Sequence, residues 1–470
     1  MSTPNTHYGR ALADMLASAR AIYFLGIGGI SMSSLAMLTA RRGIRVGGYD
    51  RTRSEVTGRL EAAGIAVYDD VDPAHLDTYD AVVYTVAIPE NHPEYAEAKR
   101  RGLPLISRAD YLGYLMLGYR NRVGIAGSHG KSTATCMCAQ IFMSADTDPT
   151  VMSGAPMRSM GGAFRLGKQN SMIFEACEYK DSFLDFNPTV AVVLNCELDH
   201  VDYFSGMEQL RTSFAAFADR AGEDGCVIYN ADDEQTRQAM QSVSARRVTF
   251  GREDQTADYR ATNVTLEGGY AAFDLWQKDR PMGRVRLRVP GAHNVYNALA
   301  AAAAAHMCGI CSRDIVKGLE EFEGAVRRME YKGKMNGAVV YDDYGHHPTE
   351  VRATLHESKL LGSGRLICAF QPHTYSRTAT LFDDYVSALC EADAVVVAPI
   401  YAAREVNDCG VSAAKLATAI NAATGRQLAE SCEDIAQVAS ALERLARPGD
   451  TVIVMGAGNI DSVYVGLPLE

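Results

Sequence analysis

An alternation of apolar strand signals with helix signals, separated by glycine-rich or polar turns, most constrains what this chain can fold into. "AIYFLGIGGI" is an apolar strand that enters a glycine turn, "SMSSLAMLTARRG" follows as a helix that ends at Gly43, and "IRVGGYD" is the next strand. This rhythm predicts a parallel sheet with crossover helices. The chain has 470 residues, which is too long for one ordinary domain.

Two further blocks repeat the pattern. The second begins at "NRVGIAG" and contains the strand signals "SMIFEACE" and "TVAVVLNCELDH". The third opens near "KGKMNGAVVYDDYGHHP" and continues with "RLICAFQPHTYSR", "ADAVVVAPIY" and "TVIVMGAGN". We therefore predict three α/β domains over residues 1–118, 119–325 and 326–470, which are Rossmann-like, P-loop ATPase-like and again Rossmann-like. Ligands of such sheets gather at the carboxyl ends of the strands, where the polar motifs of this chain stand.

Composition excludes several classes of function. The net charge of −11 argues against a general nucleic-acid or membrane-surface binder, because both of those partners are anionic. The eleven cysteines are scattered along the chain, as is typical of a protein in the reducing cytosol. No apolar run reaches the ~18 residues of a membrane span, and the first residues lack the pattern of a secretion signal. We expect a cytoplasmic protein without membrane insertion or a nucleic-acid partner.

The first glycine turn follows a strand and opens a helix. Gly26, Gly28, Gly29 and Ile30 form it, and the glycines let backbone N–H groups approach a diphosphate at the helix N-terminus. Asp50 ends the next strand, where a ribose-binding acid would lie. The third glycine of a dinucleotide fingerprint is replaced by serine at position 31. The motif leaves open an NAD-like ligand, a UDP-like ligand or a tight turn that binds nothing.

The second glycine turn, "GIAGSHGKSTATC", has the parts of a phosphate-binding loop but is two residues shorter than the usual pattern. That pattern, G-x-x-x-x-G-K-[ST], would need a glycine at position 125, where the chain has Ile125. Gly127 and Gly130 still let the backbone curl, Lys131 can meet the β- and γ-phosphates, and Ser132 supplies a hydroxyl for Mg²⁺. We therefore predict a nucleotide site at this turn.

Acidic and histidine residues follow the two strand signals after this loop. Glu175 and Glu178 stand at the end of "SMIFEACE", where they would face Mg²⁺. Asn195, Asp199 and His200 stand just past "VAVVLN". A lone histidine is usually structural, but His200 beside Asp199 after a buried strand is a candidate ligand of a second metal ion.

Together these motifs resemble the Mur ligase family of peptidoglycan amino-acid ligases. G-[ST]-H-G-K-[ST] is similar to the short ATP loop of that family, so the loop of this chain is not a damaged one. "GAHNVYNALAA" resembles the start of the family's adenine-binding helix, and "VRRMEYKG" resembles its arginine segment. "DDYGHHPTE", "QPHTYSRT" and "GAGNI" also fit, and the motifs extend along nearly the full chain.

The resemblance implies the residues of an ATP site. Arg327 or Arg328 would reach the phosphates, and Asp343 would hold the ribose. The adenine would be framed by His293, Asn294 and Asn297. The ATP loop itself would comprise Gly127, Ser128, His129, Gly130, Lys131, Ser132 and Thr133.

Within the family, "GIGGISMSSLA" together with "DDYGHHPTE" is most similar to the members that add the first amino acid to the cell-wall precursor. The resemblance implies that the first glycine turn binds UDP and that the substrates are UDP-N-acetylmuramate, L-alanine and ATP. It also implies an acyl-phosphate intermediate. Tyr344, His346 and Arg377 would reach the muramoyl substrate or the alanine.

The same resemblance implies ATP with two Mg²⁺ ions. Ser132 and Glu175 would hold the first ion, and His200 would hold the second. The implied catalytic residues are Lys131, His200, His346 and Arg377.

Departures from the family pattern leave some roles open. "EACEY" stands where "EADES" is common, which puts the role of Glu178 in doubt. Arg211 stands near the place where some relatives carry a carbamoylated lysine, and an arginine cannot be modified in that way. Thr374 stands where an arginine is common, and His347 with Pro348 also suits a simple helix start.

Three alternatives stay open. A nicotinamide-dependent oxidoreductase would explain the first glycine turn but not Lys131, Glu175 or His200. A nucleotide-gated scaffold would hydrolyse ATP, if at all, without an amino acid. A sister ligase would use another amino acid or a folate-like acceptor. The sequence does not decide between a monomer and a homodimer.

Overall fold

The structure is a computed structural model that describes residues 8–85, 87–168, 170–198, 203–403 and 405–470. The chain forms two compact units. The first unit spans Met1–Gly154, Met160–Arg260 and Leu299–Ile315, and the second spans Ala155–Ser159, Ala261–Ala298 and Val316–Glu470. Within the described residues the strands form three sheets, of five, ten and six strands.

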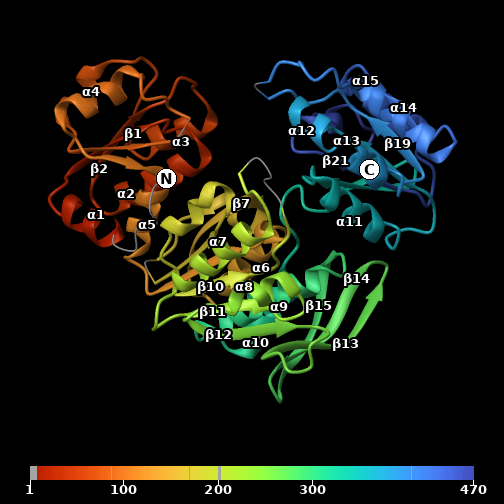
Figure 1. Cartoon of the computed structure of the whole chain (residues 1–470), viewed down its shortest axis with the longest axis horizontal. Coiled ribbons are helices and arrows are strands. Elements are labelled where there is room, and N and C mark those ends of the chain that lie inside the picture. The colour runs from red at the N-terminus through yellow and green to blue at the C-terminus, as the bar shows by residue number, and fades with distance from the viewer. Residues whose placement is uncertain (1–7, 86, 169, 199–202, 404) are drawn as a thin grey trace. The chain divides into compact units, whose positions relative to one another are not determined.

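The first sheet, drawn in red and orange in Figure 1, lies in the first unit. Its strands are β1 (Ala21–Leu25), β2 (Arg45–Tyr49), β3 (Ala66–Tyr68), β4 (Ala81–Tyr84) and β5 (Leu105–Ser107). Its helices are α1 (Tyr8–Leu16), α2 (Ile30–Arg41), α3 (Glu55–Ala62), η1 (Pro73–Thr78), α4 (Pro93–Arg101) and α5 (Arg108–Met116). The strand order is β3-β2-β1-β4-β5, and all neighbours are parallel. The chain order reverses between β1 and β4, which is where such sheets bind ligands.

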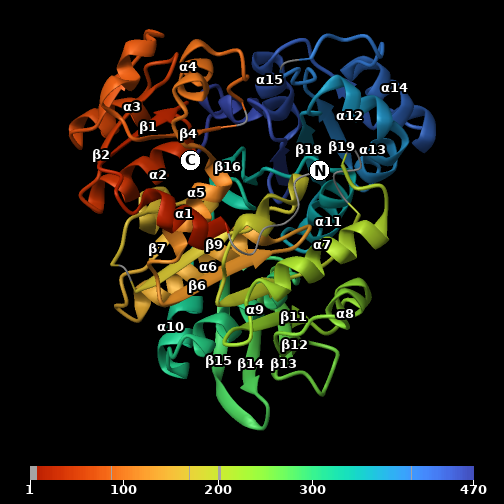
Figure 2. The same ribbon diagram turned by 60° about the vertical axis from the view of Figure 1, so that its left-hand side comes forward.

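The second sheet carries the second glycine turn. Its strands are β6 (Asn121–Ala126), β7 (Thr150–Met157), β8 (Gly162–Arg165), β9 (Ser171–Glu175), β10 (Val190–Val193), β11 (Cys226–Asn230), β12 (Arg246–Gly251), β13 (Tyr259–Glu267), β14 (Tyr270–Gln277) and β15 (Arg280–Pro290). Their order is β15-β14-β13-β12-β11-β10-β6-β9-β7-β8, and β6 is parallel to both β9 and β10. Figures 1 and 2 show β13, β14 and β15 as long neighbouring strands.

The helices that belong to this part of the chain are α6 (Lys131–Ser144), η2 (Arg158–Met160), η3 (Tyr179–Asp185), α7 (Met207–Asp219), α8 (Glu234–Met240), α9 (Asn294–Met307) and α10 (Ser312–Glu321). The turn after β6 leads directly into α6. Since β6 lies between β9 and β10, the residues that follow these three strands meet at one edge of the sheet.

The third sheet lies in the second unit and has a hydrophobic core on each face. Its strands are β16 (Glu330–Met335), β17 (Ala338–Asp343), β18 (Leu366–Phe370), β19 (Ala394–Val397), β20 (Ala429–Ser431) and β21 (Thr451–Met455). Its helices are α11 (Pro348–Ser358), α12 (Tyr375–Thr380), α13 (Phe382–Leu389), α14 (Ala413–Thr424), α15 (Ile435–Leu445) and η4 (Ile460–Val465). The order is β16-β17-β21-β18-β19-β20, and β16 alone of these described strands runs antiparallel to its neighbour. Phe370 packs in one core with Leu355, and the adjacent Ala369 packs in the other with Leu442, as the two-residue period of a strand requires.

Several helix boundaries follow from capping residues. Ser54 caps α3 in a capping box with Thr57, whose backbone N–H donates to the Ser54 hydroxyl. His347 is the N-cap of α11 and Pro348 is its first residue, as the helix-start reading of this pair predicted. α4 ends at Arg101 and is capped by Gly102, whose φ of 72° is the left-handed conformation that glycine adopts most easily.

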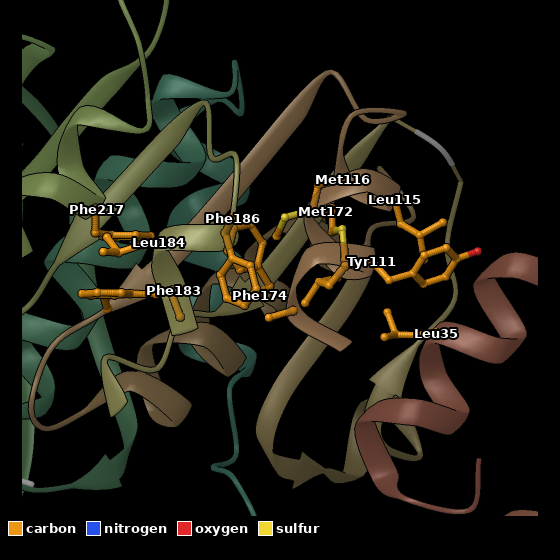
Figure 3. Close-up of a cluster of buried hydrophobic side chains, with 14 of the residues drawn as sticks. Leu35, Tyr111, Leu115, Met116, Met172, Phe174, Phe183, Leu184, Phe186 and Phe217 are labelled. Atoms are coloured by element: carbon orange, nitrogen blue, oxygen red, sulfur yellow. The ribbon is translucent and has the colours of Figure 1, made fainter. Parts of the chain in front are cut away.

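The core of the first unit runs continuously between its two sheets. Figure 3 shows this core from Leu35 and Tyr111 through Phe174 to Phe183 and Phe217. All five side chains are buried, and the rings of Phe183 and Phe217 stack with centroids 4.8 Å apart. Leu35 lies on α2 and Phe174 on β9, so elements next to both glycine turns share one core.

The predicted α/β architecture with parallel sheets is confirmed. "SMIFEACE" is strand only as far as Glu175, after which the chain leaves the sheet and turns into η3. The domain boundaries at residues 118 and 325 stay predictions. In the part of the chain that the structure describes, no helix combines the length and the apolar character needed to cross a bilayer.

Replacing Phe174 with alanine tests this core. Phe174 is 0% exposed, so Phe174→Ala loses buried apolar surface and leaves a cavity, and we expect the free energy of unfolding to fall by ~3–5 kcal/mol. Leu360 is 54% exposed, and Leu360→Ala should change the free energy by less than ~0.5 kcal/mol. Urea unfolding followed by circular dichroism measures both. Equal stability of the two variants would contradict the described core.

Candidate functional site

The phosphate-loop candidate connects β6 to α6, and glycines allow its path. Gly127 has a φ of 148°, and a Cβ there would lie 2.9 Å from the Cβ of Leu194. Gly130 precedes α6 with a φ of 82°, a left-handed conformation that costs other residues about 1–2 kcal/mol. The loop therefore packs closely on the residues that follow β10.

The segment after β10 holds the loop in shape. Asn195 accepts the His129 N–H through Oδ1 at 2.8 Å and donates to the His129 carbonyl through Nδ2 at 3.1 Å. The Ser128 hydroxyl donates to the Glu197 carbonyl at 2.7 Å and accepts the Glu197 N–H at 2.9 Å. These reciprocal pairs fix Ser128 and His129, so hydrogen bonds within the protein hold the shape of the loop.

Lys131 turns its ammonium group back into the loop. Its Nζ donates to the Gly127 carbonyl at 2.6 Å, to the Ser128 carbonyl at 3.1 Å and to Glu178 Oε1 at 3.0 Å. The Lys131 side chain is 14% exposed and that of Glu178 is 1% exposed. Burial alone would lower the pKa of Lys131, but Glu178, Cys177 and Glu175 outweigh it and raise the pKa. The positive charge is therefore held in place at neutral pH.

Ser132 and Glu175 form a pair of oxygen ligands beside Lys131. The Ser132 hydroxyl donates to Glu175 Oε2 at 2.7 Å, and the Gly154 N–H donates to the same oxygen at 2.9 Å. A Cβ at Gly154 would lie 2.4 Å from that oxygen, so a larger residue there would displace the Glu175 carboxylate. Hydroxyl and carboxylate oxygens are the ligands that Mg²⁺ prefers, and this pair fits such an ion. His200, the predicted ligand of the second metal ion, and its neighbour Asp199 lie outside the described residues.

The described residues contain no group of three or more histidine, cysteine, aspartate or glutamate side chains that could hold a metal ion.

Two consecutive left-handed residues, Lys180 and Asp181, follow Glu178. Their φ values of 54° and 55° are rare for residues other than glycine. The Asp181 carboxylate accepts hydrogen bonds from the Tyr203 hydroxyl at 2.6 Å and from the Ser213 hydroxyl. The bond to Asp181 raises the pKa of Tyr203 to about 12. The sequence left the role of Glu178 open. The residue types after Glu178 do not predict the left-handed turn that Asp181 holds in place.

The first glycine turn is organised by Asp50. Gly26 leaves β1 with a φ of 83°, and the Gly28 N–H donates to Asp50 Oδ2 at 2.9 Å. A Cβ at Gly28 would lie 2.8 Å from that oxygen. Gly29 precedes α2 and Ile30 begins it, with no side-chain cap at the helix end. Asp50 thus faces the turn itself, and its contact with a ribose stays a prediction.

The carboxylate of Asp343, at the end of β17, accepts hydrogen bonds from two backbone N–H groups. Oδ2 accepts the Met329 N–H at 2.9 Å, and Oδ1 accepts the Gly345 N–H at 2.7 Å. Burial raises the pKa of Asp343, although Arg328 and the two N–H groups oppose that rise. Asp343 therefore fastens the segment before β16 to the end of β17.

The two predicted phosphate-binding arginines differ in their contacts. Arg327 donates to the Gly456 carbonyl at 2.5 Å and to the Gly458 carbonyl at 3.3 Å. Both guanidinium groups lie over the ring of Tyr344, Arg327 at 5.3 Å and Arg328 at 5.2 Å from its centroid. Arg327 thus connects the turn after β21 with the Tyr344 segment.

His346 and Arg377 lie near a histidine that the sequence analysis did not select as a site residue. The rings of His346 and His373 are 5.9 Å apart, and the charge of Arg377 lowers the pKa of both. Burial is the main cause that lowers the pKa of His346 to about 4, although Glu350 opposes it. His346 is therefore neutral at pH 7. The sequence feature that could have identified His373 is its place in "QPHTYSRT", the segment that also contains the predicted site residue Arg377.

The predicted adenine residues stand at the start of α9. Asn294 Nδ2 donates to the Pro290 carbonyl at 2.6 Å, and Asn297 Nδ2 donates to Asn294 Oδ1 at 2.9 Å. Both asparagines are buried. His293 Nδ1 lies 2.5 Å from Glu357 Oε2 on α11.

The structure therefore gathers the predicted residues inside each unit. The phosphate loop, with Thr133 in the first turn of α6, meets Glu175 and Glu178 in the first unit. The second unit contains His293, Asn294, Asn297, Arg327, Arg328, Asp343, Tyr344, His346 and Arg377.

Comparison with known proteins finds three family models in chain order. They are "Mur ligase family, catalytic domain" over residues 21–120, "Mur ligase middle domain" over 125–305 and "Mur ligase, glutamate ligase domain" over 327–458. The UDP-N-acetylmuramate–L-alanine ligase of Caldicellulosiruptor bescii is 39% identical over 443 residues, which cover 93% of this chain and 96% of the relative. The enzyme of the same name from Clostridium botulinum strain Alaska E43 is 40% identical over 449 residues, covering 95% and 96%.

Solved structures give the same fold. The UDP-N-acetylmuramate–alanine ligase of Thermotoga maritima matches with a TM-score of 0.76 and 25% identity, covering 94% of this chain and 97% of that one. A murein peptide ligase from Psychrobacter arcticus matches with a TM-score of 0.68 and 23% identity, covering 95% and 97%.

A double-mutant cycle tests the buried pair of Lys131 and Glu178. Lys131→Met and Glu178→Gln should each lower the free energy of unfolding by about 3 kcal/mol, because each leaves the opposite charge buried without its partner. The double variant removes both charges and should lose clearly less than the sum of the two. Urea unfolding measures all three variants. Additive losses would show that the two charges do not interact.

Proposed function

This chain belongs to the Mur ligase family, and we propose that it joins L-alanine to the lactyl carboxylate of UDP-N-acetylmuramate in a reaction driven by ATP. Mur ligases are ATP-dependent ligases. One observation carries the proposal: full-length similarity to UDP-N-acetylmuramate–L-alanine ligases coincides with a glycine loop that directs Lys131 and Ser132 to a pair of carboxylates. The product would be a precursor of peptidoglycan.

The chemistry needs an activated acid, because a carboxylate repels an amine and has no good leaving group. Transfer of the γ-phosphoryl group of ATP to the lactyl carboxylate gives an acyl phosphate and ADP. The amine of L-alanine then attacks the acyl carbon, and the tetrahedral intermediate expels phosphate. Catalysis of the first step depends on positioning two anions and neutralising their charge.

Lys131 supplies a fixed positive charge for this step. Its ammonium group is held by two loop carbonyls and Glu178, so it does not have to be ordered when ATP arrives. The loop that carries it is preformed through Asn195 and Glu197. We assign Lys131 to the β- and γ-phosphates of ATP.

We assign Mg²⁺ to the same place. The Ser132 hydroxyl and Glu175 carboxylate would hold one ion, and His200 would hold a second. Bound Mg²⁺ would neutralise phosphate charge and draw the lactyl carboxylate towards the γ-phosphate.

The remaining predicted residues bind the rest of the substrates in this proposal. The turn of Gly26, Gly28, Gly29 and Ile30, together with Asp50, takes the UDP group. His293, Asn294 and Asn297 frame the adenine, Asp343 takes the ribose, and Arg327 or Arg328 reaches the phosphates. Tyr344, neutral His346 and Arg377 take the muramoyl group or the alanine.

We also infer a cytoplasmic location, because eleven cysteines scattered along the chain are typical of a protein in the reducing cytosol. Whether the chain is a monomer or a homodimer stays open.

Omitting substrates one at a time tests the reaction. Phosphate release from ATP should fall to background when either UDP-N-acetylmuramate or L-alanine is left out, because the acyl phosphate needs the first and its turnover needs the second. ¹⁸O placed in the acceptor carboxylate should appear in the released phosphate. ATP turnover without an amino acid would favour the scaffold alternative, and a change in nicotinamide absorbance without ATP would favour an oxidoreductase.

Removing the fixed charge tests the role of Lys131. Lys131→Ala should lower kcat by ~10²–10³, the usual loss when a preorganised charge contact is removed from such a site. Lys168 is exposed in the same unit, and Lys168→Ala should keep the activity of the unaltered chain. Steady-state phosphate release measures both, with circular dichroism to confirm folding. A Lys131→Ala variant that keeps most activity would exclude the assignment.

A further inference from the structure

The turn before α9 closes around the carboxylate of Glu357 on α11. His293 Nδ1 lies 2.5 Å from Glu357 Oε2, and the His293 backbone N–H donates to Glu357 Oε1 at 3.4 Å. Gly291 has a φ of 105°, and a Cβ there would lie 2.6 Å from Glu357 Oε2. Both carboxylate oxygens are thus in contact with one short segment, and a glycine makes the close approach possible. All of these residues belong to the second unit.

Charge strengthens this contact. Partial desolvation would lower the pKa of His293, whose side chain is 51% exposed, but Glu357 and, more weakly, Asp343 outweigh it and raise the pKa. Burial would raise the pKa of Glu357, but His293 and then His356 outweigh it and lower the pKa. The groups whose charges act on the pair are therefore Asp343 on β17 and His356 on α11. Imidazolium and carboxylate pair below the raised pKa of His293, and the pair is lost as pH rises through that pKa.

The contact sets the position of the predicted adenine segment. Asn294 follows His293 directly and Asn297 lies one turn further along α9, and the hydrogen bonds of their side-chain amides to Pro290 and Asn294 lie within residues 290–297. The Gly291 N–H donates to the Gly269 carbonyl at 2.9 Å, and Glu357 on α11 is the partner of the His293 side chain. α11 begins just after Asp343 and His346, so the contact connects the adenine segment with the element next to the predicted ribose residue.

We propose that Glu357 is a positioning residue for ATP: it holds His293 and the turn 291–293 before α9 in place, so that His293 is oriented for the adenine before the nucleotide arrives. The proposal rests on the proposed function, which assigns adenine to His293, Asn294 and Asn297. Without Glu357 the His293 side chain loses its partner and has to be ordered when ATP binds, so affinity falls while the chemistry at the phosphates is unaffected.

Direct binding of ATP to the full chain tests this, by calorimetry between pH 6 and pH 9 without the acceptor or alanine. Glu357→Gln should weaken ATP binding about tenfold at pH 7, the size expected for one lost charge-assisted hydrogen bond. The unaltered chain should lose affinity as pH rises through the raised pKa of His293, and Glu357→Gln should lack that loss. In turnover, Glu357→Gln should raise KM for ATP and leave kcat within about twofold.

Two further variants sharpen the result. Glu391→Gln removes the ion pair of 2.6 Å with Lys359, which lies just after α11, and should bind ATP like the unaltered chain. Glu357→Asp keeps the charge but shortens the side chain, and should weaken binding by less than Glu357→Gln. Equal affinity of Glu357→Gln and the unaltered chain, or the same pH dependence in both, would overturn the proposal. If the unaltered chain bound no ATP at all, the proposed function would fail first and this inference with it.

Discussion

One buried positive charge, the ammonium group of Lys131, sets the arrangement around the phosphate loop. Two loop carbonyls and Glu178 surround it, and each of these groups is held by other parts of the first unit. Asn195 fixes the loop, and the turn anchored by Asp181 carries Glu178 to its place. A charge that is ordered in advance needs no reorganisation when phosphate charge develops nearby, which is the physical basis of electrostatic catalysis.

Charged side chains that are held in place by the protein also stand at the ends of other strands. Asp50 after β2, Glu175 at the end of β9 and Asp343 at the end of β17 each accept a hydrogen bond from a backbone N–H, of Gly28 and Gly345 in neighbouring turns and of Gly154 on β7. Each of these carboxylates is also a predicted ligand-binding residue. A side chain that is held by a backbone N–H is already oriented before a ligand arrives, and this lowers the entropy lost on binding.

The sequence predicted the architecture and the glycine turns because their signals are local. Gly127, Gly130 and Lys131 follow an apolar strand and begin a helix, and the structure has this order. Glu178 could not be placed in the same way, since its position depends on Lys180 and Asp181 adopting left-handed conformations that neither residue type indicates. Glu357 was not found because it stands in an ordinary helix, and its contact with His293 joins segments 64 residues apart. Arg327 was expected at the phosphates, but its bonds to the turn after β21 depend on tertiary structure alone.

A crystal structure with a non-hydrolysable ATP analogue tests the central claim most directly. We predict that the triphosphate lies against residues 127–132, with Lys131 Nζ within hydrogen-bond distance of a β- or γ-phosphate oxygen. A triphosphate bound elsewhere, with Lys131 still enclosed by Glu178 and the loop carbonyls, would contradict the assignment of this loop as the catalytic nucleotide site.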